Sequence, residues 1–523
     1  MKVVVATAGL LMMMMTCSWS WLVLSDSSDS NLLINRNNFP DGFIFGVGSS
    51  AYQLEGATNS DGRKPSIWDT FVRQYPEKIS DHSTGDVAEE FYYRYKEDIA
   101  LVKEIGLDSF RFSISWPRIL PGGKISRGVN QEGVDFYNSL IDELLSNGIQ
   151  PLVTLFHWDL PQTLEDEYGG FLSPNIVNDY RDYVDFCFNE FGDRVRHWIT
   201  LNEPNLFTAC GYSDGTTAPG RCSDYIGNCT AGNSATEPYL VAHHLILSHA
   251  TAVKLYRDKY KGSQNGTLGI TMETYWMVPK YDTVVSQKAA SRALDFAFGW
   301  IVHPVTYGDY PKIMRVMVGN RLPQFTEEES RMVRGSIDFL GINYYTARYV
   351  DDCTSCPTGD VNLSYTTDSH VNETTEKNGV PIGEPTEAGG WIYIYPKGIR
   401  EMVLYVKRKY MNPPIYITEN GMADFNNKTL PIKEALNDSL RIKYHSLHLS
   451  QLLKAIKDGA DVRGYYVWSF LDDFEWEFGY TDRYGVTYVD FKNNLKRYLK
   501  RSAFWFKNFL AKDNIANTSF ASM

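Results

Sequence analysis

The sequence lacks the short motifs that mark several common enzyme classes. It has no Gly-x-Ser-x-Gly turn to present a nucleophilic serine, no His-Glu-x-x-His pair of zinc ligands and no basic patch. Its net charge is −12, and an acidic surface repels phosphate backbones. We therefore expect no nucleic-acid partner, no cofactor and no metal. Zinc held by His157, Glu203 and Glu419 is the one metal site that remains conceivable.

Long apolar runs are equally scarce, and the one that exists lies at the N-terminus. Residues 3–24 are almost uninterruptedly apolar, follow Lys2 and give way to a polar Ser/Asp segment. We interpret residues 1–25 as a signal peptide removed on export, with the extracellular space (apoplast) or the vacuole as destination. A membrane anchor is the alternative, because the run is near spanning length. No other stretch is long and apolar enough, so we expect no membrane association after cleavage.

Seven cysteines and several sugar-acceptor motifs fit a secretory route. Cys222 and Cys229 close a short loop and are expected to form a disulfide, whereas a bond between Cys353 and Cys356 is left open. Cys187 lies on the apolar face of a helical pattern and is predicted to be a core residue. The pattern Asn-x-Ser/Thr predicts glycosylation at Asn228, Asn265, Asn362, Asn372, Asn427, Asn437 and Asn517.

Short apolar runs alternate with amphipathic helical patterns along the rest of the chain. Eight runs are typical of strands: 43–48, 110–116, 151–157, 195–202, 269–275, 339–345, 415–418 and 465–470. Helical patterns lie between them, for example over 85–105 and 399–410. The alternation predicts an α/β fold, a (β/α)8 TIM barrel in a single domain over residues 32–512, with a tail over 513–523. A doubly wound sheet also alternates, but its glycine-rich phosphate turn is missing. The polar stretch 351–390 is predicted to be an elaborate loop near the barrel mouth.

Two glutamates stand in matching settings more than two hundred residues apart. Glu203 follows the apolar run 195–202 and precedes a proline, and Glu419 follows 415–418 and precedes Asn-Gly. In a barrel, the C-terminal ends of the strands open into one cleft, so both carboxyl groups are expected to face it. Two such carboxyls can act as acid/base and nucleophile on an acetal.

Polar and aromatic side chains at other predicted strand ends support a sugar site. Gln, His, Asn and Glu can hydrogen-bond vicinal hydroxyls, and Trp offers a flat face to a pyranose. Structural roles are the alternative for each: a core histidine, an arginine that neutralises a buried acid, a tryptophan that fills the barrel. The residues are Gln53, Arg111, His157, Trp158, Asn202, Asn343, Tyr345, Trp468, Glu475 and Trp476.

These residues carry a resemblance to a known family. The segments 200–204 (TLNEP) and 417–421 (ITENG) resemble the two catalytic signatures of glycoside hydrolase family one, and 45–56, 110–116, 155–161, 343–345 and 468–476 fit the same family in the same order. The resemblance covers about residues 35–510 and is nearest to plant β-glucosidases that act on cyanogenic glucosides, other specialised-metabolite glucosides or disaccharide glycosides.

The resemblance implies roles for individual residues. Glu203 matches the acid/base and Glu419 the nucleophile of a retaining reaction, which needs the two carboxyls roughly 5–5.5 Å apart. Arg111 and Tyr345 match positions that hold the nucleophile. The sugar-binding and leaving-group positions match Gln53, His157, Asn202, Asn343, Tyr345, Trp391, Trp468, Glu475, Trp476 and Tyr484.

The implied substrate is a small-molecule β-glucoside, with its aglycone undetermined. Cys210, Thr217 and Glu477 stand where relatives often carry bulky apolar groups, and Tyr484 replaces a common Phe, so a polar aglycone or a second sugar is the hypothesis. Three other hypotheses for the function stay open: a transglucosidase, a non-sugar hydrolase of the hydroxyisourate type, and a non-catalytic glycan-binding protein. The sequence leaves the choice between monomer and homodimer undecided.

Overall fold

The computed structural model describes residues 34–353, 356, 362–388 and 390–511, and the described residues from Asn35 onward belong to one unit. The predicted signal peptide, Cys17, the tail 513–523 and Asn517 lie outside the described residues. Within the described part of the chain, no helix has both the length and the apolar character needed to cross a bilayer.

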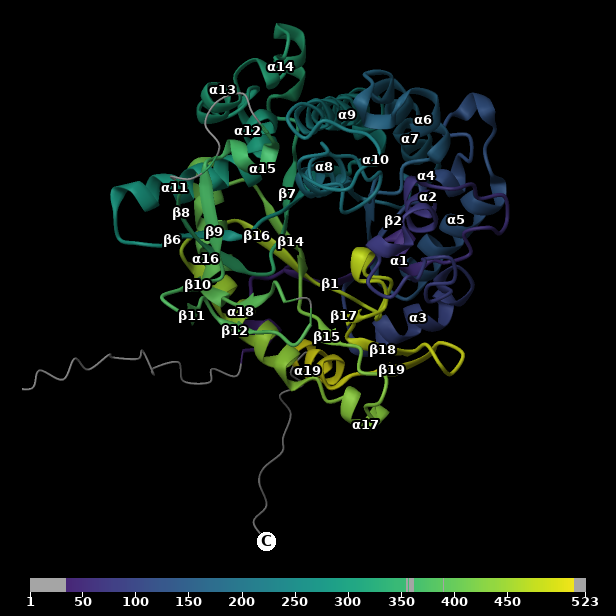
Figure 1. The fold of residues 1–523 in the computed structure, drawn as a ribbon. Coiled ribbons are helices and arrows are strands. Elements are labelled where there is room, and N and C mark those ends of the chain that lie inside the picture. The colour runs from purple at the N-terminus through teal and green to yellow at the C-terminus, as the bar shows by residue number, and fades with distance from the viewer. Residues whose placement is uncertain (1–33, 354–355, 357–361, 389, 512–523) are drawn as a thin grey trace, which may run out of the picture. The chain divides into compact units, whose positions relative to one another are not determined.

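Eight parallel strands close into a barrel, in the order β1-β16-β14-β7-β5-β4-β3-β2 (Figure 1). The predicted (β/α)8 barrel is therefore confirmed. The barrel strands are β1 (Ile44–Gly48), β2 (Ser109–Ser113), β3 (Gln150–Thr154), β4 (His197–Asn202), β5 (Thr267–Glu273), β7 (Phe339–Asn343), β14 (Ile415–Asn420) and β16 (Val462–Val467).

Amphipathic helices surround the barrel, with α3, α5 and α7 to the right of its strands in Figure 1 and α16 to the left. Their apolar faces turn inward: on α5, Tyr137, Leu140, Ile141 and Leu144 are buried at the three- and four-residue spacing of an amphipathic helix. The longer helices are α3 (Phe91–Ile105), α5 (Gln131–Ser146), α7 (Asn175–Phe191), α9 (Glu237–Lys259), α11 (Val284–Leu294), α16 (Pro396–Lys409), α18 (Ser439–Lys457) and α19 (Arg501–Leu510).

Shorter elements connect these. The short helices are α1 (Ala51–Leu54), α2 (Ile67–Gln74), α4 (Trp116–Ile119), α6 (Gln162–Tyr168), α8 (Pro204–Tyr212), α10 (Lys261–Gln264), α12 (Trp300–Tyr307), α13 (Lys312–Val318), α14 (Glu327–Val333), α15 (Tyr365–Asp368) and α17 (Ile432–Ala435). The short strands are β6 (Trp276–Pro279), β8 (Ala347–Asp352), β9 (Val371–Thr374), β10 (Glu376–Lys377), β11 (Val380–Pro381), β12 (Glu384–Pro385), β13 (Tyr393–Ile394), β15 (Asp424–Phe425), β17 (Asp482–Arg483), β18 (Thr487–Asp490) and β19 (Lys496–Leu499).

Side chains fill the interior of the barrel. Leu152, Ile199, Phe339 and Tyr466 come from β3, β4, β7 and β16 and pack into one buried cluster. Because these strands lie on different sides of the barrel, the cluster is part of a packed core and not a pore. Because the interior is filled, a ligand site built from polar strand-end residues can lie only at the C-terminal end of the barrel.

Several predicted boundaries were wrong. The helix predicted over 85–105 begins only at Phe91, because Ala88 and Glu90 adopt positive φ values of 46° and 54°, which a right-handed helix does not allow. Several barrel strands stop earlier than their apolar runs: β2 ends at Ser113 and β3 at Thr154. The first residues beyond these ends, Ile114 and Leu155, still donate backbone hydrogen bonds to the carbonyls of Thr154 and Ile199 on the neighbouring strands.

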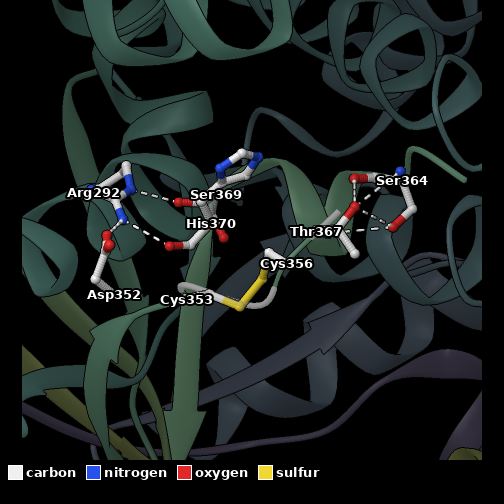
Figure 2. Close-up of a disulfide and its surroundings, with 8 residues drawn as sticks. All are labelled: Arg292, Asp352, Cys353, Cys356, Ser364, Thr367, Ser369 and His370. Carbon is white, nitrogen blue, oxygen red and sulfur yellow. Dashed lines mark hydrogen bonds and ion pairs between the residues drawn. A yellow bond between two sulfur atoms is a disulfide. The ribbon is translucent and has the colours of Figure 1, made fainter. Parts of the chain in front are cut away.

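Both disulfides that the sequence offers are formed. Cys222 bonds Cys229, as predicted, and Cys353 bonds Cys356. Figure 2 shows the second bond beside β8 and β9, where Arg292 pairs with Asp352 and also donates to the carbonyl of His370. The described part of the predicted loop 351–390 carries four short strands, β9 to β12, and the end of β8, so it is more regular than its polar composition indicated.

Cys187 is a free, fully buried thiol on the inner face of α7, so its predicted core position is confirmed. The sugar-acceptor asparagines that lie in the described ranges are all exposed: Asn228, Asn265, Asn362, Asn372, Asn427 and Asn437. Their glycosylation stays a prediction.

Candidate active site

The carboxyl of Glu419 is held by two donors at the end of β14. Arg111 donates from Nη1 to Oε1 at 2.5 Å, and the Tyr345 hydroxyl donates to Oε2 at 2.6 Å. Arg111 comes from β2 and is fully buried, while Tyr345 follows β7. Three strands that are distant in sequence thus orient one carboxylate, and both donors favour its ionised form.

Glu203 directly follows β4 and precedes α8, and its backbone has a φ of +45°. A left-handed conformation is costly for a glutamate and is kept only where the surroundings enforce it. Here the Glu203 N–H donates to the carbonyl of Thr271 at 2.8 Å, and Pro204 starts the helix. The side chain accepts a hydrogen bond from Asn343 Nδ2 at 2.6 Å. The strained turn therefore fixes the direction of the Glu203 carboxyl.

The Asn202 amide connects this pair to His157. Its Oδ1 accepts from Arg111 Nη2 at 2.5 Å and from Asn343 at 3.2 Å, so its Nδ2 must donate to His157 Nε2, at 3.0 Å. Burial, and then the charge of Arg111, lowers the pKa of His157 well below its usual value. The imidazole is therefore neutral and carries its proton on Nδ1. No side chain in the described ranges bonds that nitrogen.

Both glutamates line one cavity of about 340 Å³ at the C-terminal end of the barrel. Thirteen of the residues singled out in the sequence line it: Glu203, Glu419, His157, Trp158, Tyr345, Trp391, Trp468, Glu475, Trp476, Tyr484, Cys210, Thr217 and Glu477. The other lining residues are Leu206, Glu273, Tyr275 and Phe478. The cavity is large enough for a hexose and part of a leaving group, which is a size typical of ligand sites.

Four predicted residues, Gln53, Arg111, Asn202 and Asn343, are buried behind the lining side chains. Gln53 donates from Nε2 to Glu475 Oε2 at 3.2 Å and accepts from the Ser50 hydroxyl at 2.8 Å. These four hold the lining carboxyls and His157 in place.

Aromatic rings form the walls of the cavity. Trp476 packs on Trp158, with ring centroids 4.7 Å apart, and lies 6.0 Å from the His157 ring, which also lies 6.0 Å from Trp468. Trp391 lies 5.5 Å from Tyr345. Flat apolar faces beside carboxyls and a neutral imidazole are the surroundings that a pyranose ring binds.

The two glutamates differ in what surrounds their charge. Burial, and then the negative charge of Glu419, raises the pKa of Glu203 well above the usual carboxyl value. Burial also raises the pKa of Glu419, but Arg111 and the Tyr345 hydrogen bond oppose that rise. Glu419 is therefore the first of the pair to ionise, and Glu203 keeps its proton, which is the division between a nucleophile and an acid.

Sequence reasoning missed several residues of this site, and two of them, Thr418 and Glu273, carry polar groups. Thr418 donates from Oγ1 to Asn343 Oδ1 at 2.7 Å and so fixes the amide that holds Glu203. Glu273 ends β5 and lines the cavity. A carboxyl at the end of the apolar run 267–272 was the available signal for Glu273, whereas Thr418 on its own gave none.

Replacing Thr418 with valine is expected to lower kcat by about three- to tenfold, because the Asn343 carbonyl loses a buried hydrogen bond. The Asn343 hydrogen bond favours ionised Glu203 and lowers its pKa, so a loosened amide should raise that pKa and shift the alkaline limb of the pH–rate profile to higher pH. Thr271→Val is the matched control, because the Thr271 hydroxyl only donates to Thr418, at 3.3 Å. A lower melting temperature with kcat and pH profile unchanged in Thr418→Val would show a purely structural role.

Comparison with known proteins identifies the family. The sequence profile described as Glycosyl hydrolase family 1 matches residues 35–515. The chain belongs to glycosyl hydrolase family 1. It is 65% identical to β-glucosidase 17 of Arabidopsis thaliana over 478 residues, which cover 91% of this chain and 92% of that protein. It is 54% identical to furcatin hydrolase of Viburnum furcatum over 500 residues, which cover 94% and 91%.

Solved structures of family 1 enzymes agree with the fold. The crystal structure of rice Os3BGlu6 β-glucosidase matches with a TM-score of 0.90 at 51% identity and covers 92% of this chain and 100% of that one. The predictions of the family, the barrel and a glycoside hydrolase are therefore confirmed. No group of three or more His, Cys, Asp or Glu side chains in the described ranges is arranged to hold a metal ion.

Proposed function

We propose that this family 1 enzyme is a retaining β-glucosidase, with residues 32–512 as its catalytic domain, that hydrolyses O-β-glucosides with Glu419 as nucleophile and Glu203 as acid/base. One observation carries the proposal. The two carboxyls come from the ends of β14 and β4, line the same cavity, and have surroundings that ionise one and protonate the other. A general acid and a nucleophile on either side of a glycosidic bond are what retention requires.

In the first half of the reaction, ionised Glu419 attacks the anomeric carbon. The bond from that carbon to the leaving-group oxygen breaks, and Glu203 gives this oxygen its proton, so the leaving group departs as a neutral alcohol. The sugar is then bonded to Glu419 as an ester, and Glu203 is ionised. Arg111 and Tyr345 keep the nucleophile oriented for the attack through the hydrogen bonds described above.

In the second half, ionised Glu203 takes a proton from water while the water oxygen attacks the same anomeric carbon. The ester bond breaks, Glu419 leaves as a carboxylate, and glucose is released in the β configuration. Both glutamates return to their starting protonation. A variant of the rice Os3BGlu6 enzyme has been crystallised in a covalent complex with Glc, which supports this ester intermediate by analogy.

We divide the cavity lining into a sugar side and a leaving-group side according to the family positions that its residues match. We assign sugar binding to Glu475, Trp476 and His157, supported by Gln53, Asn202 and Asn343, with Trp468 as the stacking face. Burial, and then the neighbouring charge of Asp473, raises the pKa of Glu475 well above its usual value, so its carboxyl can both donate to and accept from hydroxyls. We assign Trp391 and Tyr484 to the leaving-group side.

The stereochemistry of cleavage tests the proposal. Purified enzyme is mixed with phenyl β-glucoside, and the anomers are followed by NMR from the first turnover. We expect β-glucose to form first and to mutarotate later. Release of α-glucose first would contradict retention. Failure to cleave any β-glucoside, with hydrolysis of hydroxyisourate instead, would contradict the proposed substrate, and glucosylated alcohols as main products with added acceptors would indicate a transglucosidase.

We propose that the protein reaches the apoplast or the vacuole through the secretory pathway. The apolar N-terminal run, two disulfides and six exposed sugar-acceptor asparagines support this route. Protein isolated from its native tissue should lack residues 1–25 and lose mass when N-glycans are removed enzymatically. An intact N-terminus with no change in mass would contradict the proposal.

A further inference from the structure

A third glutamate stands at a strand end beside the two already described. Glu273 is the last residue of β5, which lies next to β4 in the barrel. Glu273 is only 7% exposed, yet it lines the cavity. Its Oε1 has no hydrogen-bond partner among the described residues. A buried carboxyl oxygen without a partner is costly, so its persistence in a ligand cavity indicates that a ligand supplies the partner.

The neighbouring cation does not satisfy this carboxyl. Arg348 donates to the backbone carbonyls of Ala347 and Trp391, each at 2.9 Å, and its guanidinium stacks on the Tyr275 ring at 4.4 Å. Neither of these two hydrogen bonds of Arg348 reaches the Glu273 carboxyl. Burial raises the pKa of Glu273 to about 8, against the opposing charge of Arg348. At neutral pH the group is therefore largely a neutral carboxylic acid, which both donates and accepts a hydrogen bond.

The position of Glu273 places it on the leaving-group side. Glu273 ends β5, the strand beside β4, and Glu203, which protonates the departing oxygen, directly follows β4. Glu475 and Trp476 lie on the sugar side of the proposed division. The nearby Tyr275 ring lies 6.1 Å from Trp391, and these two rings line the cavity together. A flat leaving group next to the scissile oxygen would therefore meet two aromatic rings and one unsatisfied carboxyl.

We propose that Glu273 determines leaving-group specificity by hydrogen-bonding a hydroxyl group of the leaving group. The inference rests on the proposed β-glucosidase function and adds the chemical class of the preferred leaving group, a neutral ring that carries a hydroxyl. A hydroxylated aromatic ring and a second sugar both have this chemistry. An anionic leaving group is disfavoured, because Glu477, whose pKa burial raises to about 7, also lines the cavity.

The test compares leaving groups within two series of similar acidity, so that bond cleavage itself differs little inside each series. The 2-, 3- and 4-hydroxyphenyl β-glucosides are compared with phenyl β-glucoside, and disaccharides of β-linked glucose are compared with cyclohexyl β-glucoside, whose leaving group is also an alcohol. The measured quantity is selectivity, the kcat/KM for each hydroxylated substrate divided by that for the unhydroxylated glucoside of its series. We expect wild-type enzyme to favour at least one hydroxylated substrate, and the best one distinguishes an aromatic leaving group from a second sugar.

Glu273→Met should lower this selectivity by about tenfold, because an apolar side chain of similar length leaves the substrate hydroxyl without a partner. Glu273→Gln should keep most of it, since an amide also donates and accepts. Glu373→Gln is the matched control: this exposed residue of β9 contributes charge near Glu273 but does not line the cavity. It should leave the selectivity unchanged.

Three results would overturn the proposal: wild-type enzyme without preference for any hydroxylated leaving group, Glu273→Met with unchanged selectivity, or equal losses in the methionine and glutamine variants. Because selectivity is a ratio within one preparation, a partly unfolded variant does not imitate the expected result. Wild-type cleavage of phenyl β-glucoside with release of β-glucose is scored separately, so failure of the proposed function is distinguishable from failure of this inference.

Discussion

Replacing Glu419 with glutamine is expected to lower kcat for every β-glucoside by a factor on the order of 10⁴ or more. The amide cannot attack the anomeric carbon to form the ester, and no other carboxyl in the cavity is held by both a buried arginine and a tyrosine hydroxyl. Because glutamine keeps the shape of glutamate, it can still accept from Arg111, and the fold should be retained. Steady-state kinetics with phenyl β-glucoside, together with a thermal melt, measure the effect.

The matched control for this variant is Glu132→Gln, which changes an exposed glutamate on α5 in the same way. Its kcat should equal that of the wild type within about twofold, as is usual for surface substitutions away from a site. Residual activity of Glu419→Gln above one hundredth of wild type, with no contaminating wild-type enzyme, would show that Glu419 is not the nucleophile.

Replacing Glu203 with alanine is expected to give a loss that depends on the leaving group. Loss of general acid catalysis should cost about 10²- to 10⁴-fold for phenyl β-glucoside, whose leaving group needs a proton. The formation of the glycosyl-enzyme should change far less for 2,4-dinitrophenyl β-glucoside, whose leaving group departs without one. Pre-steady-state release of the two phenols measures this difference directly.

Two further observations define the role of Glu203. Azide needs no deprotonation, so in Glu203→Ala it should attack the glycosyl-enzyme, restore turnover of the activated substrate and yield β-glucosyl azide. In wild-type enzyme the pKa of Glu203 lies above the usual carboxyl range, so Glu203 keeps its proton to higher pH. Activity should fall only as the pH rises through the pKa of Glu203. Equal losses for both substrates and an unchanged alkaline limb in Glu203→Ala would assign the proton donor elsewhere.

Sequence patterns predicted the barrel and most of the site for a physical reason. Buried parallel strands require continuous apolar runs, so Glu203 and Glu419 stood out as charges directly after such runs. The same reasoning predicted an inward-facing Cys187 from its spacing on α7. The early ends of β2 and β3 were not predictable, because Ile114 and Leu155, the first residues beyond them, are as apolar and as fully buried as the strand residues.

Roles that depend on a specific neighbour also escaped prediction. Thr418 has the β-branched side chain that a strand favours, and only the position of Asn343 makes its hydroxyl significant. Glu273 ends its strand as the two catalytic glutamates do, but its lack of a hydrogen-bond partner is visible only once Arg348 is placed on Tyr275. Sequence patterns therefore located the carboxyls, and tertiary contacts separated their functions.

A trapping experiment with 2-deoxy-2-fluoro-β-glucosyl fluoride is the most direct test that Glu419 and Glu203 serve one glycosidic bond. The 2-fluoro group slows both chemical steps, and the fluoride leaving group lets the first step proceed, so a glycosyl-enzyme accumulates. We expect intact mass spectrometry to show one bound fluoroglucose per chain and proteolytic mapping to place it on Glu419, with no labelling of Glu419→Gln. A label on any other residue, or no label on an enzyme that hydrolyses β-glucosides, would contradict the account.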